Sequence, residues 1–552
     1  MFEHPAPWFE EVRELTERLV RVRSVSPGAG EQDVAREVLA ILTEDGRSTA
    51  YTAAGLDPIP NDPWGRSNAY AYLRGASEKT VILFGHIDTV GTADYGSLEP
   101  FALSPDDLLR GFEAGVSPDG FFDRDMAEYP GDWLFGRGVV DMKSGVAVNL
   151  AVMRHMAAQA HTSPSPLSVI VLATVDEENE SAGALRAAEF LLEMRTRHGL
   201  QYVGAVNTDY TTSLYPDDPH RYVYTGSIGK LLPSFYIVGR ESHVGDPFAG
   251  IDANVILAEL VRTCALDTDL CDVVGKDVAP PPVTLHAQDL KAQYDVQLPF
   301  EAWVYINLLT LTSTPADVLA RLCQNAQDAL ATVLDRIAAA ERRWSVTGGQ
   351  NRREARVTQT GTVIAYADLL QRAQAAAGPH EVESALAQVW QQTLTTADSR
   401  TRSLALVRRL WSLSGLSGPA IVVYFSPPFY PHVATPESPL LDAMRTVIRA
   451  HPDLHLIEER YFPFLSDMSY VRLDVDDSLD ALVDNMPVWL DDGHPSRPGG
   501  YSLPFAALRE LDLPVINFGP YGRGAHQRGE RVLMSYTFET LPRLVLEVMA
   551  NL

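Results

Sequence analysis

The sequence has little cysteine, a deficit of basic charge and no long apolar run. Its 552 residues include only three cysteines, Cys264, Cys271 and Cys323, and none lies in a CxxC pair. This argues against a disulfide framework and against a cysteine zinc site, so a reducing cytoplasm is the expected compartment. The 72 acidic residues outnumber the 45 basic ones and give a net charge of −27. Such a charge argues against nucleic acid or an anionic membrane as the main partner.

Signals for secretion and membrane insertion are also missing. The first residues, MFEHPAPWFEEV, contain neither a basic segment nor an apolar one, so no signal peptide is expected. No apolar run approaches the roughly 18 residues of a membrane span. With 46% hydrophobic residues the composition is that of a soluble globular protein. The length exceeds that of one ordinary core, so two or more domains are expected.

The hydrophobic pattern predicts an α/β sheet that is covered on both faces. Short apolar runs typical of buried strands alternate with segments of helical periodicity. The predicted strands lie at residues 67–73, 80–86, 167–175 and 202–209, and a helix is predicted at 144–160.

A change of pattern after TGSIGK (225–230) predicts an inserted domain. From about residue 313 the chain is mostly helical, starting at Thr314-Pro315, a good N-cap followed by proline, with a polar break at 345–354. The strand PAIVVYF and the proline-rich SPPFYPHVATPESP are interpreted as the return to the first domain, where LPVINFG resumes the α/β pattern. The predicted parts are a catalytic domain at 1–228 and 430–552, and an insertion at 229–429.

Side chains suited to metal binding follow several predicted strands. In FGHIDTV, His86 and Asp88 are two residues apart, so an extended backbone places both on one face. A metal-binding histidine commonly donates its other N–H to a carboxylate. A buried histidine beside a solvated aspartate explains the pair as well. In FGRGVVDMKSG, Asp141 follows closely spaced glycines and precedes a helix, where it is either a ligand or an N-cap.

Three adjacent carboxylates, Asp176, Glu177 and Glu178, follow the strand that ends at Val175. They repel one another unless solvent or a cation compensates their charge. Neighbouring side chains on an extended segment point in opposite directions, so Glu177 and Glu178 cannot do the same work. One can bind a cation while the other faces a bound water. The alternative is a solvated acidic loop.

Two further candidates complete an ordered set. Asp209 ends a strand in NTDY, where an aspartate that starts a turn is the alternative, and His526 lies in the glycine-rich loop FGPYGRGAHQRGERV. Together the motifs supply two histidines and three carboxylates as ligands, with one carboxylate to spare. Such a set suits two borderline cations such as zinc. No GxSxG elbow or catalytic-cysteine signature competes with this interpretation.

With these motifs in this order, the sequence resembles the M20 family of metallopeptidases and aminoacylases. The segments GDWLFGRGVVDMKSG, TVDEENESAG, NTDY and FPFLSDMSY are most similar to the arginine-utilisation branch from bacilli. The resemblance implies an α/β fold with a zinc-peptidase-like catalytic domain and a covered, mostly parallel sheet. An inserted α+β lid domain, enlarged here by helices, would interrupt it.

The resemblance also implies roles for individual residues. Two divalent metal ions are expected, zinc by preference, with manganese or cobalt as alternatives. Their ligands would be His86 and Asp209 for one ion, Glu178 and His526 for the other, and Asp141 as the bridge. Asp88 would orient His86, Glu177 would be the general base, and His243 in GRESHVGDPFAG of the lid would polarise the scissile carbonyl.

The function implied by the resemblance is hydrolysis of an amide bond in a small peptide or N-acyl amino acid, with an arginine-related substrate expected, by a metal-bridging hydroxide. A non-catalytic binding or regulatory protein on the same fold and a one-metal hydrolase are the alternatives. A homodimer through the lid would let His243 act in trans, whereas a monomer would use it in cis. Arg523 is a candidate for binding a substrate carboxylate and Asp467 for an amine or guanidinium, and structural roles explain both as well.

Overall fold

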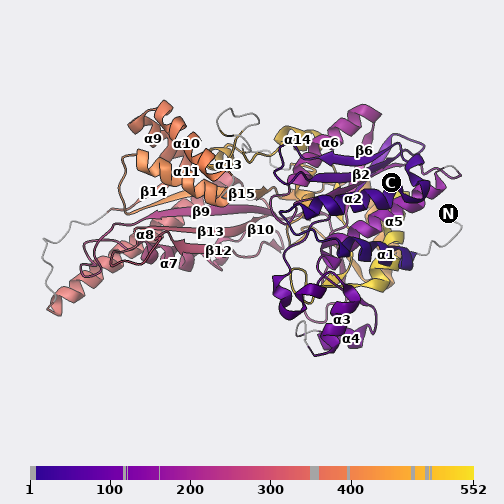
Figure 1. Ribbon diagram of the computed structural model, residues 1–552, viewed down its shortest axis with the longest axis horizontal. Helices are drawn as coiled ribbons and strands as arrows, with labels where there is room; N and C mark the ends of the chain where they lie inside the picture. The colour runs from indigo at the N-terminus through magenta and orange to yellow at the C-terminus, as the bar shows by residue number, and fades with distance from the viewer. Residues whose placement is uncertain are drawn as a thin grey trace. The chain divides into compact units, whose positions relative to one another are not determined.

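The chain folds into two compact units, coloured along the sequence in Figure 1. The computed structural model describes residues 8–115, 120, 122–160, 162–348, 360–394, 398–473, 479–490, 497 and 500–552. The first unit comprises Met1–Ser227, Val433–Asp474 and Pro504–Leu552, and the second comprises Ile228–His432 and Val475–Leu503. Part of the polar break predicted at 345–354 lies outside the described residues.

The first unit is built on an eight-stranded sheet in the order β1-β2-β5-β3-β6-β18-β7-β17. Strands β5, β3, β6 and β18 run parallel to one another, whereas β1 and β2 are antiparallel neighbours at one side. The prediction of an α/β fold with a large, mostly parallel sheet is therefore confirmed. The strand bounds are β1 Ala53–Pro58, β2 Ser67–Leu73, β3 Lys79–His86, β5 Ser168–Thr174, β6 Gln201–Asn207, β7 Arg221–Tyr224, β17 Leu456–Glu459 and β18 Val515–Asn517.

Helices pack on both faces of this sheet, which explains why its central strands are apolar along their whole length. On one face, Ile82 and Phe84 of β3 pack near Leu191 of α6. On the other face, Gly85 lies against Val146 of α5. The helices of this unit are α1 Trp8–Arg21, α2 Gly30–Thr43, α3 Pro105–Glu113, α4 Phe122–Glu128, α5 Ser144–Gln159, α6 Ala182–His198, α12 Pro439–Ala450, α14 Phe505–Leu511 and α15 Leu541–Ala550.

A small three-stranded sheet in the first unit carries the loop of His526. Its order is β19-β20-β4, and all its pairs are antiparallel. Strands β19 (Gly522–Arg523) and β20 (Arg531–Leu533) form a hairpin, and β4 (Trp133–Phe135) leads into the turn that carries Asp141. Two loops that are remote in sequence are thus brought together by one short sheet.

The second unit has a five-stranded sheet in the order β12-β13-β9-β15-β14. Its longest helix, α8, begins after Thr314, whose side chain and Asp317 form a capping box. The strand bounds are β9 Gly229–Val238, β12 Val283–Asp289, β13 Glu301–Thr310, β14 Thr362–Ala365 and β15 Ala420–Tyr430. The helix bounds are α7 Ala253–Cys264, α8 Pro315–Val346, α9 Tyr366–Ala377, α10 Pro379–Thr393, α11 Ser399–Leu413 and α13 Asp480–Asp484.

The boundaries of the units differ from the predicted ranges: the second unit extends over Ile228–His432 and also includes residues 475–503, which the prediction gave to the catalytic part. Asn485 explains why. Its carbonyl accepts a hydrogen bond from the backbone of Phe425, and its side chain accepts one from the backbone of Ala367. The hydroxyl of Tyr501 likewise accepts a bond from the backbone N–H of Phe429. The segment also buries apolar side chains, among them Leu482, Met486 and Val488, but its pattern alone does not show which unit they pack in.

The hydrophobic stretches of the helices are short. No helix in the described part of the chain is long and apolar enough to cross a membrane.

Candidate metal centre

Three of the predicted ligands lie at the carboxyl ends of neighbouring parallel strands. His86 is the last residue of β3, Glu178 follows β5, and Asp209 follows β6. These strands are adjacent in the order β5-β3-β6. Because the carboxyl ends of parallel strands meet at one edge of a sheet, side chains from distant parts of the chain converge there.

Asp141 lies in a tight turn that leads into α5. Gly138 has a φ of 75°, in the left-handed region that glycine adopts without a steric cost. A Cβ on Gly145 would lie 1.9 Å from the carbonyl oxygen of Thr208, so glycine lets α5 approach the segment that carries Asp209. The peptide bond between Asp141 and Met142 is cis.

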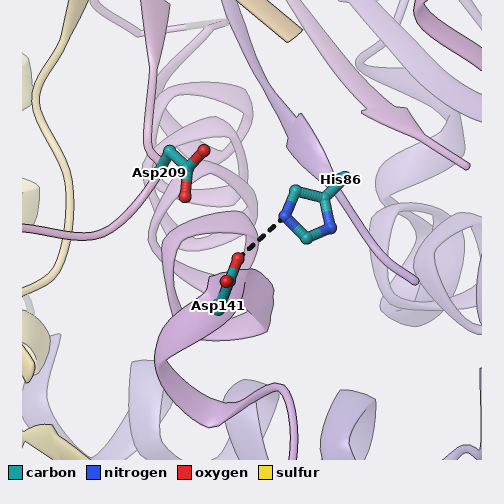
Figure 2. A group of neighbouring side chains, drawn as sticks. All are labelled: His86, Asp141 and Asp209. Atoms are coloured by element: carbon teal, nitrogen blue, oxygen red, sulfur yellow. Dashed lines mark hydrogen bonds and ion pairs between the residues drawn. The ribbon is translucent and has the colours of Figure 1, made fainter. Parts of the chain in front are cut away.

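His86, Asp141 and Asp209 form the first candidate triad. Figure 2 shows the three side chains at the ends of their elements, with the hydrogen bond between His86 and Asp141 drawn as a dashed line. His86 Nε2 lies 3.0 Å from Asp141 Oδ1. One potential ligand atom from each residue lies within 4.8 Å of the others, and all three residues are buried.

Asp141, Glu178 and His526 form the second candidate triad, so Asp141 belongs to both. His526 Nε2 lies 3.0 Å from Glu178 Oε1 and 3.2 Å from Asp141 Oδ2. One carboxylate oxygen of Asp141 therefore faces His86 and the other faces His526. A carboxylate placed in this way is suited to bridge two cations.

The hydrogen bonding of His86 leaves its other nitrogen available for a metal. Its Nδ1 lies 3.2 Å from the carbonyl oxygen of Asp88, which can only accept, so Nδ1 carries the proton. Nε2 lies within hydrogen-bonding distance of Asp141 Oδ1, and its lone pair becomes available to a metal when it loses the proton of that bond. Fixing the tautomer through Nδ1–H is the usual arrangement for a metal-binding histidine.

The carboxylate of Asp88 has a second set of contacts that the sequence did not suggest. Its Oδ1 accepts the backbone N–H of Glu177 at 3.2 Å, and its Oδ2 accepts that of Glu178 at 3.0 Å. The distance from Oδ1 to His86 Nδ1 is longer, 3.5 Å. Asp88 therefore holds the turn that carries both glutamates, in addition to lying beside the imidazole.

The electrostatics of the centre are dominated by crowded, buried carboxylates. Burial raises the pKa of Glu177 and of Asp209 well above their ordinary values, and neighbouring carboxylates add to the shift. Burial opposes a charged His86, but its contacts with Asp141 and Asp88 outweigh this and raise the pKa of His86. Burial likewise opposes a charged His526, but its contacts with Asp141 and Glu178 outweigh this and raise the pKa of His526 to about 11. The site attracts positive charge.

This donor set fits divalent cations. Imidazole nitrogens and carboxylate oxygens are ordinary zinc ligands, and each triad gathers three of them around a common point. Because Nδ1 keeps its proton for the carbonyl of Asp88, a deprotonated Nε2 would direct its lone pair into the first triad.

Glu177 lies beside the triads without belonging to either. It is buried, and its Oε2 lies 3.9 Å from His86 Nε2, beyond hydrogen-bonding distance. Glu178 reaches His526 instead. The two adjacent glutamates therefore make different contacts.

Three further candidate residues, His243, Arg523 and Asp467, are ligands in neither triad. His243 is exposed in the second unit, where its Nδ1 accepts the backbone N–H of Gly245. Arg523 forms an ion pair with Asp125. Asp467 is buried and accepts a hydrogen bond of 2.7 Å from Thr174. These contacts give Arg523 and Asp467 structural partners within the first unit.

Sequence reasoning missed the residues that support the centre. Glu530 lies four positions after His526, and its buried side chain bonds to the turn of Asp141. Arg137 stands between two glycines of the quoted FGRG motif and pairs with Glu530. Proximity to a motif was the only signal for either residue, since nothing in the spacing reveals that they form a pair.

Comparisons with known proteins identify relatives of the chain. Residues 119–486 match the family model described as Peptidase family M20/M25/M40. The chain is 33% identical to the Bacillus subtilis protein YqjN over 97% of this chain and 95% of that protein. It is 30% identical to Bacillus subtilis protein RocB over 98% of this chain and 95% of that one.

A solved structure shows the same fold. The M20 family metallo-carboxypeptidase Sso-CP2 from Sulfolobus solfataricus superposes with a TM-score of 0.51 at 11% identity, covering 98% of this chain and 99% of that one. At this identity the likeness concerns the fold alone. The family match and the two full-length relatives carry the assignment, and the resemblance predicted from the sequence is confirmed: this chain belongs to peptidase family M20/M25/M40 and is a hydrolase.

Proposed function

We propose that this chain is a two-metal hydrolase that cleaves an amide bond in a small peptide or an N-acyl amino acid. The observation that carries the proposal is the pair of triads that share Asp141, one carboxylate oxygen facing each histidine. A buried glutamate that belongs to neither triad lies beside them.

In this proposal the chain would hold the two ions as the sequence predicted. His86 and Asp209 would hold one ion, Glu178 and His526 would hold the other, and Asp141 would contribute a carboxylate oxygen to each. Asp88 fixes the tautomer of His86 through its carbonyl and holds the turn of both glutamates through its carboxylate. We propose zinc as the physiological metal because the ligands are nitrogen and oxygen.

When bound, two divalent cations supply polarisation of a carbonyl oxygen and a more acidic water. The residues of the chain would do the rest. Glu177 accepts a proton from the attacking water and returns it to the leaving nitrogen, which is the work of a general acid–base group. Its burial keeps bulk solvent away from that proton.

The substrate class is proposed from the resemblance of the sequence motifs to the arginine-utilisation branch from bacilli. An arginine-related N-acyl amino acid or dipeptide is the first compound class to examine. A reducing cytoplasm is proposed as the compartment, since the three cysteines are free.

The proposed function is tested by stripping the protein with a chelator and restoring single metals. We expect zinc, manganese or cobalt to restore cleavage of members of a panel of N-acyl amino acids and dipeptides, including arginine and ornithine derivatives. Mass spectrometry should count two ions per chain. One ion per chain in the fully active protein, or no cleavage of any amide, would contradict the proposal.

The second unit is proposed to act as a lid that supplies His243. The N–H of Gly245 donates to His243 Nδ1 at 3.0 Å, so the proton of the neutral imidazole resides on Nε2. The Nε2–H group is a hydrogen-bond donor of the kind that polarises a carbonyl. The side chain is exposed, as a group that meets a substrate must be.

A homodimer through this unit is proposed from the edge of its sheet. Strand β12 pairs only with β13 among the described strands, and its Val283 and Leu285 are 46% and 53% exposed. An open edge with apolar side chains is a natural surface for pairing with a second copy.

Mixing two inactive variants tests whether His243 acts in trans. We expect Glu177→Gln and His243→Ala homodimers to be inactive alone, and activity to return after subunit exchange, because one mixed site would contain both intact residues. Exchange itself is verified with differently tagged chains. A monomeric mass in solution with no recovery would assign His243 to its own chain, and full activity of His243→Ala would remove its role altogether.

A further inference from the structure

The loop of His526 and the turn of Asp141 are joined by one buried carboxylate. Glu530 Oε1 accepts the backbone N–H groups of Val140 at 3.1 Å and Asp141 at 3.3 Å. Its Oε2 accepts a hydrogen bond of 2.9 Å from Arg137 Nη1. Glu530 therefore ends the loop that begins after β19 and contacts the backbone of the residue shared by both triads.

Arg137 opposes the buried charge of Glu530, although burial and the nearby carboxylate of Asp141 still raise the pKa of Glu530 to about 7. Arg137 is 1% exposed, and its other nitrogens reach Asp94 and the carbonyl of Gly91. A buried charge that loses its partner is costly, whereas a paired and hydrogen-bonded one is tolerated. Glu530 itself is fully buried. The geometry of the pair is thus fixed by contacts on both sides and does not depend on solvent.

The hairpin that carries the loop is also held at its base. Asp125 is buried and pairs with Arg523 of β19 and Arg531 of β20. Arg531 donates a further bond of 2.7 Å to the carbonyl of Gly529. With both strands of the hairpin anchored, the side chain of Glu530 fixes the remaining freedom of the loop relative to Asp141.

We propose that Glu530 is a positioning residue that sets the affinity of the ion bound by Asp141, Glu178 and His526. It is not a ligand in either triad. It acts by fixing the backbone of Asp141 and the loop of His526 in one arrangement. This inference rests on the proposed two-metal function. The other ion shares only Asp141 with this linkage, so it should be affected less.

A matched pair of variants separates this role from general stability. Glu530→Ala removes both contacts, whereas Glu530→Gln keeps an oxygen for the backbone N–H groups and loses the charge opposite Arg137. Asp57→Asn is the control, because Asp57 is another buried carboxylate held by an arginine, Arg186, and belongs to neither triad.

The readout is metal binding to chelator-treated protein, with Zn²⁺ followed by calorimetry and Co²⁺ by its visible spectrum. His526→Ala, which lacks the ligand itself, identifies the signal of the second ion. We expect Glu530→Ala to lower the affinity for that same ion by about 10- to 100-fold, the usual cost of losing a partner that orients a ligand. Glu530→Gln should show a smaller loss, and Asp57→Asn should match the wild type.

The remaining outcomes would contradict the inference. Wild-type affinity for both ions in Glu530→Ala would overturn it, and so would an equal loss in Asp57→Asn. If Glu530→Ala does not fold, Glu530→Gln provides the test. An unchanged affinity for the second ion in that variant would overturn the positioning role. A wild-type protein that binds fewer than two ions would instead overturn the proposed function on which the inference rests.

Discussion

Glu177→Gln is expected to lower turnover by about 10²- to 10⁴-fold while both metal ions remain bound. The amide has the shape of the carboxylate but cannot accept the proton of the attacking water. Glu177 belongs to neither triad, so its replacement leaves the candidate ligands in place. Steady-state kinetics and the metal content of the same preparation measure the two effects together.

The neighbouring residue provides the control for this variant. Glu178→Gln makes the same chemical change one position along the chain. Glu178, however, belongs to the second triad, where its Oε1 lies 3.0 Å from His526 Nε2. It should lose one ion as well as activity. If Glu177→Gln retains full activity, the base lies elsewhere, and if it loses metal as Glu178→Gln does, Glu177 is a ligand.

The strands that carry the centre could be predicted because their signals are local. Apolar runs bounded by turn residues placed β3 at 80–86 and β5 at 167–175, against Lys79–His86 and Ser168–Thr174 in the structure. The same reasoning placed polar side chains at the strand ends. Parallel strands gather those ends at one edge, so residue order alone was enough to propose a common site.

Strand β15 shows where local signals fail. The sequence predicted a short strand followed by a proline-rich crossing, but β15 continues through Pro427 and Pro428 to Tyr430. Its regular register with β9 is interrupted between Ser426 and Tyr430, and its pairing with β14 ends at Val423. The prolines therefore occupy positions where no ladder donor is required, a condition set by the neighbouring strands.

The residues that support the centre could not be predicted from the sequence, for a different reason. Glu530 bonds to a backbone group 390 positions earlier, and no periodicity links residues at that distance. Asp88 was assigned to His86 on spacing, yet its carboxylate lies closer to the backbone of Glu177 and Glu178. Patterns indicate which residue types gather at a site, whereas the contacts that hold them follow from tertiary packing.

Asp141→Asn is expected to remove both ions and to lower turnover by on the order of 10³-fold or more, since metal ions contribute several kcal/mol to such reactions and each 1.36 kcal/mol is a factor of ten. Asp141 is the one residue that both triads contain. Asparagine keeps a single ligand oxygen and no charge, so it cannot serve two cations. Each site would keep only one carboxylate, Asp209 in the first and Glu178 in the second, without the shared negative charge. That is too little to retain an ion.

Asp209→Asn separates a shared ligand from an unshared one. Asp209 is equally buried at a strand end but belongs only to the triad with His86. We expect this variant to lose one ion and to keep the one bound with His526, which mass spectrometry and the Co²⁺ spectrum can distinguish. Because the two substitutions make the same chemical change, the difference in metal count measures sharing alone. If Asp141→Asn still binds two ions, or if both variants lose the same single ion, Asp141 does not bridge the pair.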